Sequence, residues 1–186
     1  MSQAAAERTI AGVAPGEVAE TWCTPSRWPE FVDGLARVGS ADPAYPEPGS
    51  VVEWSSYPAG RGEVREIVVE YVPGSLVASD VEDESTRARQ AVSFTGTPGG
   101  TAVRIELDYE LRRRGPFTAL TDLLFVRRAQ ADSLRRTLAG LELGQGRVGA
   151  VRFPGLQRVE ALAVEAPEAL RVLPPGVDVG DLHRID

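Results

Sequence analysis

The chain has 186 residues, of which 42% are hydrophobic and 25% charged, a composition typical of one folded domain and not of a disordered or fibrous chain. Its 20 basic and 27 acidic residues give a formal net charge of −7, a field that repels phosphate backbones, so we expect no nucleic-acid partner. All basic residues are Arg, which excludes mechanisms that need a lysine, such as a Schiff base or a P-loop.

The N-terminal part predicts one strand followed by two short helices. Residues 7–14 form a short β-like run that ends at Pro15-Gly16. Pro15 can open a helix because the first helical residue needs no N–H bond, and Thr24-Pro25 interrupts that helix. Apolar residues then recur at helical spacing from Trp28 to Leu35, which predicts a second short helix with one apolar face.

Residues 37–114 change to a period of two, which is typical of strands. Turn signals rich in Pro, Gly and Asp recur roughly every ten to fifteen residues, too closely for crossover helices, so we predict an antiparallel meander of six strands. The clearest strand covers residues 103–111, where apolar and charged side chains alternate without error. One face of the sheet should therefore be covered and the other solvated.

Helical spacing returns after Gly115-Pro116. Residues 117–141 predict an amphipathic helix of about 26 residues that ends near Gly144, where a helix-stopping glycine is expected. The inner face of the sheet is the only predicted surface large enough to cover it. Residues 144–186 are rich in Gly and Pro, so we expect a domain over residues 7–143 and a C-terminal extension that is partly ordered at best.

This order of elements, together with several local strings, resembles the START-like or SRPBCC superfamily, the helix-grip fold of polyketide cyclases and lipid-transfer proteins. The strings are Pro15-Gly-Glu-Val18, Ser26-Arg-Trp-Pro-Glu-Phe31, Gly49-Ser-Val-Val-Glu-Trp54, Glu66-Ile-Val-Val-Glu-Tyr-Val-Pro73 and Gly100-Thr-Ala-Val-Arg104. The resemblance implies an α+β fold in which a curved antiparallel sheet wraps around a long C-terminal α-helix, with two short helices after the first strand. It also implies a cavity between sheet and helix that holds a small apolar molecule. These strings are packing and turn signatures, so they indicate the fold and not the reaction.

Strand alternation supplies the candidate catalytic residues. It assigns Tyr109, Tyr71 and Arg65 to the face toward the helix, where a phenol could bind a ligand carbonyl and a guanidinium could stabilise an enolate. Asp80 is the most inward acid by the same alternation and a candidate general base. The alternatives are core packing for the tyrosines and a solvated hairpin for Asp80. We name Tyr109, Arg65 and Asp80 as the candidate catalytic set.

The predicted ligand-binding side chains share the covered faces of the strands and of the long helix. Gln90 alternates with Val92 and Phe94, so its amide should face the interior, where it needs a partner. Trp54 and Ser56 share a face with Val52, and core packing is the alternative for Trp54. The whole set is Tyr71, Gln90, Trp54, Ser56, Leu107, Phe94, Leu120 and Leu124.

Histidine and cysteine occur once each, as His183 and Cys23, which excludes a conventional zinc cage, a His-centred triad and an intrachain disulfide. The N-terminus contains no apolar signal segment, and no stretch approaches the roughly 20 apolar residues that cross a bilayer. We therefore expect a cytoplasmic protein with no membrane span, no metal and no cofactor.

Three functions are compatible with these patterns. The first is an enzyme of secondary metabolism, similar to a polyketide cyclase or dehydratase, that acts on a small hydrophobic molecule without a cofactor. The second is a carrier or sensor of a lipid or another small apolar ligand, and the sequence leaves these two close. The third is an interaction protein whose C-terminal extension docks a partner. The identity of the ligand and a homodimeric state stay open.

Overall fold

The computed structural model describes residues 2–58, 60–112 and 125–149, and these contain one seven-stranded antiparallel sheet. Its strands are β1 (Ser2–Ala11), β2 (Leu35–Ala41), β3 (Val51–Ser56), β4 (Glu63–Val72), β5 (Leu76–Glu82), β6 (Thr86–Thr97) and β7 (Gly100–Leu111). They lie in the order β1-β7-β6-β5-β4-β3-β2. Strands β2 to β7 are thus the predicted six-strand meander, and β1 pairs with the last of them.

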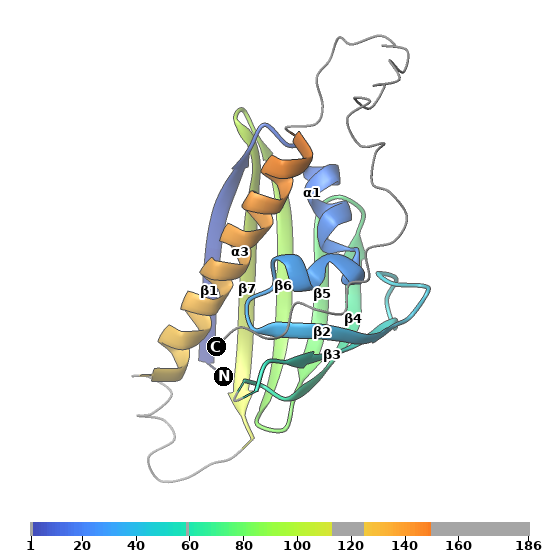
Figure 1. Cartoon of the computed structure of the whole chain (residues 1–186), viewed down its shortest axis with the longest axis vertical. Helices are drawn as coiled ribbons and strands as arrows, with labels where there is room; N and C mark the ends of the chain where they lie inside the picture. The colour runs from blue at the N-terminus through green and yellow to red at the C-terminus, as the bar shows by residue number, and fades with distance from the viewer. Residues whose placement is uncertain (1, 59, 113–124, 150–186) are drawn as a thin grey trace, which may run out of the picture. The chain divides into compact units, whose positions relative to one another are not determined.

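Among the described residues, the helical segments beside the sheet are α1 (Pro15–Trp22), the 3-10 helix η1 (Pro25–Glu30) and α3 (Arg127–Gly149). In Figure 1, α3 and α1 lie on the same face of the curved sheet, with α3 running along β1. Helix α1 begins at Pro15 as predicted, and the Glu17 carboxylate accepts a hydrogen bond from the Ala14 backbone N–H at 3.4 Å. The predicted helix-grip architecture is confirmed.

The second short helix differs from its prediction. It is a 3-10 helix that ends at Glu30, and Leu35 is the first residue of β2 instead of the last of a helical face. Two prolines, Pro25 and Pro29, lie in this segment and cannot donate backbone hydrogen bonds, so a regular α-helix does not form. The Trp28 indole N–H donates to the Trp22 carbonyl at 2.7 Å, which fixes the short turn against α1.

Strand β1 also differs from its prediction, because it covers residues 2–11 and not residues 7–14. Its inward residues include Ala4, Ala6 and Ile10, which are all buried. Alanine is uncommon in strands, so the first half carries little strand signal in the sequence. The small side chains suit the position, since α3 packs directly along this strand.

Helix α3 extends past the predicted end near Gly144 and reaches Gly149. Gln145 is buried, and its side-chain amide donates to the Thr21 hydroxyl of α1 at 2.7 Å, which holds this turn of the helix in the domain. The predicted first part of the helix, residues 117–124, lies outside the described residues, as does the segment 150–186. A separate C-terminal extension therefore stays a prediction.

The predicted alternation of β7 is confirmed. Val103, Ile105, Leu107 and Tyr109 are all at most 2% exposed and belong to the hydrophobic core. The residues between them point to the outer face, where Arg104 pairs with carboxylates of β1 and β7. The sheet thus separates an apolar inner face, covered by the helices, from a charged outer face.

Gly140 marks the closest approach of α3 to the rest of the domain. A Cβ at this position would lie 2.9 Å from the Phe31 carbonyl oxygen and 3.0 Å from the Phe31 Cα, both backbone atoms. We expect Gly140→Ala to lower the free energy of unfolding by about 1–3 kcal/mol, because this overpacking outweighs the higher helix propensity of alanine.

Gly144 provides the matched control, since a Cβ there meets no atom within 4 Å. Gly144→Ala should raise the free energy of unfolding by about 0.5–1 kcal/mol through helix propensity alone. Urea unfolding followed by circular dichroism measures both variants. Equal stabilisation by the two alanines would contradict the close seating of α3 on Phe31.

Candidate functional site

A cavity of about 80 Å³ lies between the inner face of the sheet and the helices. Its apolar wall consists of Trp22, Trp28, Val32, Trp54, Val81, Ile105, Leu107 and Leu134. Its polar wall consists of Asp33, Arg61, Glu66, Gln90, Gln130, Ser133 and Thr137. This volume is smaller than the roughly 150 Å³ of a protein cavity that holds benzene, so it could hold only a small group at one end of a larger molecule.

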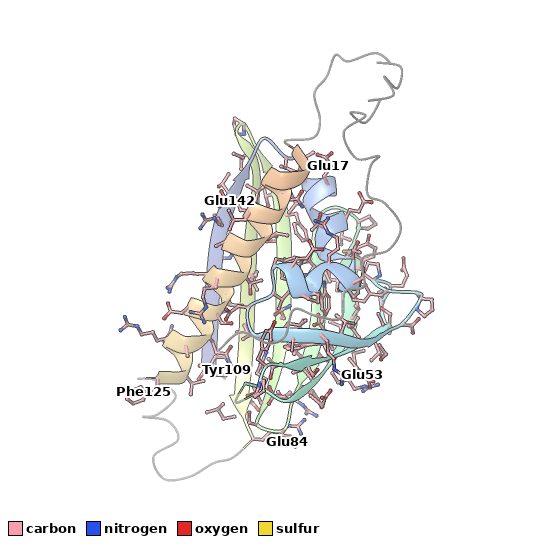
Figure 2. All side chains as sticks on the ribbon, viewed as in Figure 1. Glu17, Glu53, Glu84, Tyr109, Phe125 and Glu142 are labelled. Carbon is pink, nitrogen blue, oxygen red and sulfur yellow. The ribbon has the colours of Figure 1, made fainter. Side chains whose placement is uncertain are left out.

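A wider groove of about 390 Å³ adjoins the cavity. Five residues line both spaces and define what we call the neck: Asp33, Trp54, Arg61, Gln130 and Ser133. Phe125, which precedes α3, lines the groove and is 68% exposed, and Figure 2 shows it at the end of the helix away from Glu142. A ligand with one small polar end and an apolar remainder would fill cavity and groove together.

Glu66 is the buried acid of the cavity. It lies on β4 between Val64 and Val68, which face the same way, and it is 5% exposed. Burial raises the pKa of its carboxyl group from 4.5 to about 7, against the opposing effects of Ser79, the positive charge of Arg61, and Trp54. A carboxyl group with such a pKa is present in both protonation states near neutral pH, which is the requirement for a general acid and base.

Several buried donors near Glu66 have no partner that meets hydrogen-bond geometry among the described residues. They are the indole N–H groups of Trp22 and Trp54, the Arg61 Nη2 and the hydroxyl groups of Tyr45 and Ser79. Trp54 and Ser79 lie close enough to Glu66 to affect its pKa, yet neither reaches it in that geometry. Buried polar groups normally have partners, so these donors indicate space for a polar atom of a ligand or for water.

Asp33 fastens the loop after η1 to helix α3 beside the neck. Its carboxylate accepts from the Arg136 guanidinium at 2.8 and 2.9 Å and from the Ser133 hydroxyl at 2.8 Å. Its backbone N–H donates to the Thr137 hydroxyl at 3.0 Å. The hydrogen bonds from Arg136 hold the pKa of Asp33 below its ordinary value. One wall of the cavity is therefore fixed by an ionised carboxylate that is already fully engaged.

Three predicted ligand-binding residues, Trp54, Gln90 and Leu107, come together in the cavity wall. Ser56 lines the groove, where its hydroxyl accepts from the Gly62 backbone N–H at 2.9 Å. Phe94 and Tyr109 are buried in the core and do not belong to the described lining of the cavity or the groove. Leu120 and Leu124 lie outside the described residues. The catalytic role of Tyr109 stays a prediction.

The inward orientation predicted for Arg65 and Asp80 is wrong. The Arg65 side chain is 55% exposed and lies 3.9 Å from the Glu53 carboxylate on the outer face. The Asp80 side chain is 44% exposed and accepts from Arg89 Nε at 2.7 Å, also on the outer face. On both strands the neighbouring residue, Glu66 or Ser79, takes the inward position, so the assumed parity is off by one.

Tyr71 lies on the predicted face for a reason that the sequence does not show. The pairing of β4 with β5 shifts between Val68 and Glu70, and this bulge reverses the parity of the strand. Tyr71 then pairs with the buried Val77 and packs against the core from a half-buried position. It does not belong to the described lining of the cavity or the groove.

Glu66 and Arg61 are the residues that sequence reasoning missed. Glu66 interrupts Val64 and Val68, and this apolar spacing on the supposedly wet face is the signal that could have found it. Arg61 lies in the turn between β3 and β4, where an arginine gives no signal by itself.

Burial raises the pKa of the Cys23 thiol to about 11, so it has little thiolate character at neutral pH.

Within residues 2–58, 60–112 and 125–149, no three His, Cys, Asp or Glu side chains gather as a metal site. Over the same ranges, no helix has the length and apolar character needed to cross a membrane.

Solved structures with the same fold come from several sources. TTHA0849 from Thermus thermophilus is 21% identical, with a TM-score of 0.62 over 81% of this chain and 100% of that one. Protein NE0264 from Nitrosomonas europaea is 12% identical, with a TM-score of 0.62 over 80% and 96%. The di-domain ARO/CYC StfQ from the steffimycin biosynthetic pathway is 17% identical, with a TM-score of 0.65 over 79% and 51%. At these identities the likeness shows the fold alone.

Comparison with curated proteins gives no match. One family model matches, described as polyketide cyclase / dehydrase and lipid transport, and it covers residues 1–143. Because that match includes every strand of the sheet and extends into α3, the chain belongs to the polyketide cyclase, dehydrase and lipid-transport family.

Proposed function

We propose that this protein binds a small hydrophobic carbonyl compound with its polar end in the cavity and catalyses a cofactor-independent dehydration or cyclisation by proton transfer. The observation that carries the proposal is Glu66, a buried acid in the cavity wall with a pKa of about 7. The family includes polyketide cyclases and dehydrases, which supports a ligand and a reaction of this class.

For a β-hydroxy ketone, the proposed reaction is an elimination. The Glu66 carboxylate takes a proton from the carbon between the carbonyl and the hydroxyl-bearing carbon, and the electron pair of that C–H bond moves into an enolate. The enolate then forms the C=C bond as the C–O bond to the hydroxyl breaks, and the carboxyl group returns its proton to the leaving oxygen. The substrate loses one water molecule, and Glu66 ends in its initial state.

A carrier function is the second candidate, and the groove is the observation that favours it. The groove is about 390 Å³ in volume and has Phe125 and Val126 in its lining, which suits an apolar chain. The family description includes lipid transport. A carrier has no need of an acid with a raised pKa, however, and burying Glu66 costs stability, so we place the enzyme first.

The test uses 4-hydroxy-4-phenylbutan-2-one, whose dehydration gives a conjugated enone that ultraviolet absorbance detects. We expect Glu66→Gln to lower kcat by about 100-fold to 10,000-fold, the usual contribution of a general acid or base. Affinity for the enone, followed by quenching of Trp fluorescence, should change far less. The rate of the wild type should rise with pH through a pKa of about 7.

Glu110→Gln serves as the matched control, because Glu110 is an exposed residue of β7 that does not line the cavity. Its turnover should equal that of the wild type. If Glu66→Gln lost affinity and turnover equally, the result would support the carrier function and contradict the enzyme. Tight binding with no turnover in the wild type would lead to the same conclusion.

A further inference from the structure

Two N–H donors at the neck point to a binding site for one oxygen atom. The Arg61 Nη2 and the Trp54 Nε1 are both buried, and neither has a partner in hydrogen-bond geometry within the described part of the chain. Both residues line the cavity and the groove. The donors therefore lie where the polar end of a ligand would pass from the groove to the position of Glu66.

Asp83, at the turn between β5 and β6, accounts for the position of Arg61. Its side chain is 1% exposed, and its Oδ2 accepts from Arg61 Nε at 3.1 Å. Its Oδ1 accepts from the backbone N–H groups of Ser85 and Thr86 at 2.8 Å and from the Ser85 hydroxyl at 2.9 Å. The turn thus fixes the Asp83 carboxylate, which in turn binds the Arg61 guanidinium through Nε. The Nη2 of Arg61 remains available to another acceptor.

A buried donor without an acceptor is costly, and a positively charged one is more costly than a neutral one. Arg61 Nη2 and Trp54 Nε1 both lack an acceptor among the described residues, and a bound ligand could supply one. The acceptor must be close to Glu66, since Arg61 and Trp54 both act on the Glu66 carboxyl group. A bare hydrocarbon cannot satisfy these donors, whereas a carbonyl oxygen can.

We propose that Arg61 and Trp54 form an oxyanion-binding pair that donates to the carbonyl oxygen of the substrate and to the enolate that forms from it, and that Asp83 is the residue that positions Arg61. This inference rests on the proposed proton transfer by Glu66. As Glu66 takes the proton, the negative charge moves from its carboxylate to the ligand oxygen beside Arg61. The Trp54 N–H, which has no acceptor in hydrogen-bond geometry among the described residues, can donate to the same oxygen.

The groups around Glu66 fit this transfer of charge. Arg61 faces it from the β3–β4 turn, Trp54 from β3 and Ser79 from β5. Tyr45, from the loop between β2 and β3, is another titratable group that interacts with it. Burial raises the pKa of the Tyr45 phenol, so it stays neutral. Arg61 is thus the single positive charge among these groups, and the oxyanion would form next to it.

The test measures binding and needs no turnover. It uses the full chain with Glu66→Gln, which stands for the state in which Glu66 is protonated, and 4-nitrophenol as the probe, whose phenolate absorbs visible light. We expect the bound probe to ionise at lower pH than the free probe. Adding Arg61→Gln should weaken phenolate binding by about 10-fold or more, and adding Trp54→Phe by a smaller factor, since the first removes a charge-assisted hydrogen bond.

The neutral analogue 4-nitroanisole is the control, because it has nearly the same shape and no anionic oxygen. Its affinity should change less than about 3-fold in either variant. A general disruption of the site would weaken binding of 4-nitroanisole as much as binding of the phenolate. Asp83→Asn keeps the side-chain shape but loses the pairing with Arg61, so it should reproduce the phenolate-specific loss in part. Circular dichroism verifies the fold of each variant. If the Arg61 variant does not fold, the comparison of 4-nitrophenolate with 4-nitroanisole is made with Trp54→Phe.

The outcomes separate this inference from the proposed function. Equal losses for 4-nitrophenolate and 4-nitroanisole, or no loss for either, would overturn the oxyanion pair even if Glu66→Gln abolishes turnover. A phenolate-specific loss would support the pair as an anion site even if Glu66→Gln leaves turnover intact, in which case only the proposed reaction fails.

Discussion

Glu66→Gln is expected to stabilise the protein relative to the wild type as the pH rises from about 4.5 to 8. The folded pKa of Glu66 is raised from 4.5 to about 7, so ionisation is harder in the folded state than in the unfolded state. The contribution of Glu66 to the free energy of unfolding is therefore fully present below pH 4.5, and it is lost as the pH rises to about 7. That pKa difference corresponds to about 3 kcal/mol.

The measurement is the free energy of unfolding by urea at several pH values. The difference between Glu66→Gln and the wild type should grow by about 3 kcal/mol over this range, since Gln does not ionise. Glu110→Gln, which changes an exposed carboxylate, should show no such growth. A constant difference for Glu66→Gln across the range would mean that Glu66 ionises as readily in the folded protein as in the unfolded chain.

Gly100→Ala is expected to lower the free energy of unfolding more than Gly140→Ala does. Gly100 begins β7 with a φ of +143°, a conformation that residues with a Cβ rarely adopt. A Cβ there would lie 2.1 Å from the Ile10 carbonyl oxygen and 2.8 Å from the Gly12 backbone nitrogen. These are backbone atoms of β1 and its end, so the strand itself must move, and we expect a loss of about 4 kcal/mol or more.

The neighbouring Gly99 is the control, because its Cβ would meet nothing within 4 Å and its φ lies outside the range that disfavours a side chain. Gly99→Ala should change the free energy of unfolding by less than about 1 kcal/mol. Thermal unfolding followed by circular dichroism compares the two variants. Similar melting temperatures for both alanine variants would contradict the close contact between the start of β7 and the end of β1.

Gly100 and Glu66 have opposite effects on the stability of the fold. Gly100 is required by the fold, since it lets β1 close on β7. Glu66 is unfavourable for the fold, because replacing it should stabilise the protein at neutral pH. Residues that lower stability in a buried site are typical of functional positions, where activity needs a group that packing alone would not select.

The site shows where alternation in a sequence stops being informative. In β7 the period of two and the chemistry of the side chains agree, so the faces were predicted correctly. In β4 they disagree: Glu66 is charged but occupies the position between Val64 and Val68 that faces inward. Ile67, Val69 and Tyr71 alternate with the charged Glu66 and Glu70, and this pattern favoured the opposite parity, which placed Arg65 on the inward face.

The same limit applies to the residues that do face the cavity. Trp54, Gln90 and Leu107 were predicted because each alternates regularly with its neighbours, and the pairing of β3 with β4 and of β6 with β7 has no shift at these residues. Arg61 lies in a turn, and its relation to Asp83 joins residues that are 22 positions apart. Nothing in the local sequence relates these two residues, since the pairing of β4 with β5 brings them together.

The sequence by itself determined the order of elements, the antiparallel meander and the covering of the sheet by an amphipathic helix, because side-chain periodicity and turn residues act over a few neighbouring positions. Only the tertiary structure decided which face of β4 and β5 is inside, how large the cavity is, and which acid is buried there. These properties depend on strand register, on the bulge between Val68 and Glu70 and on the close seating of α3, which are all set by contacts between distant parts of the chain.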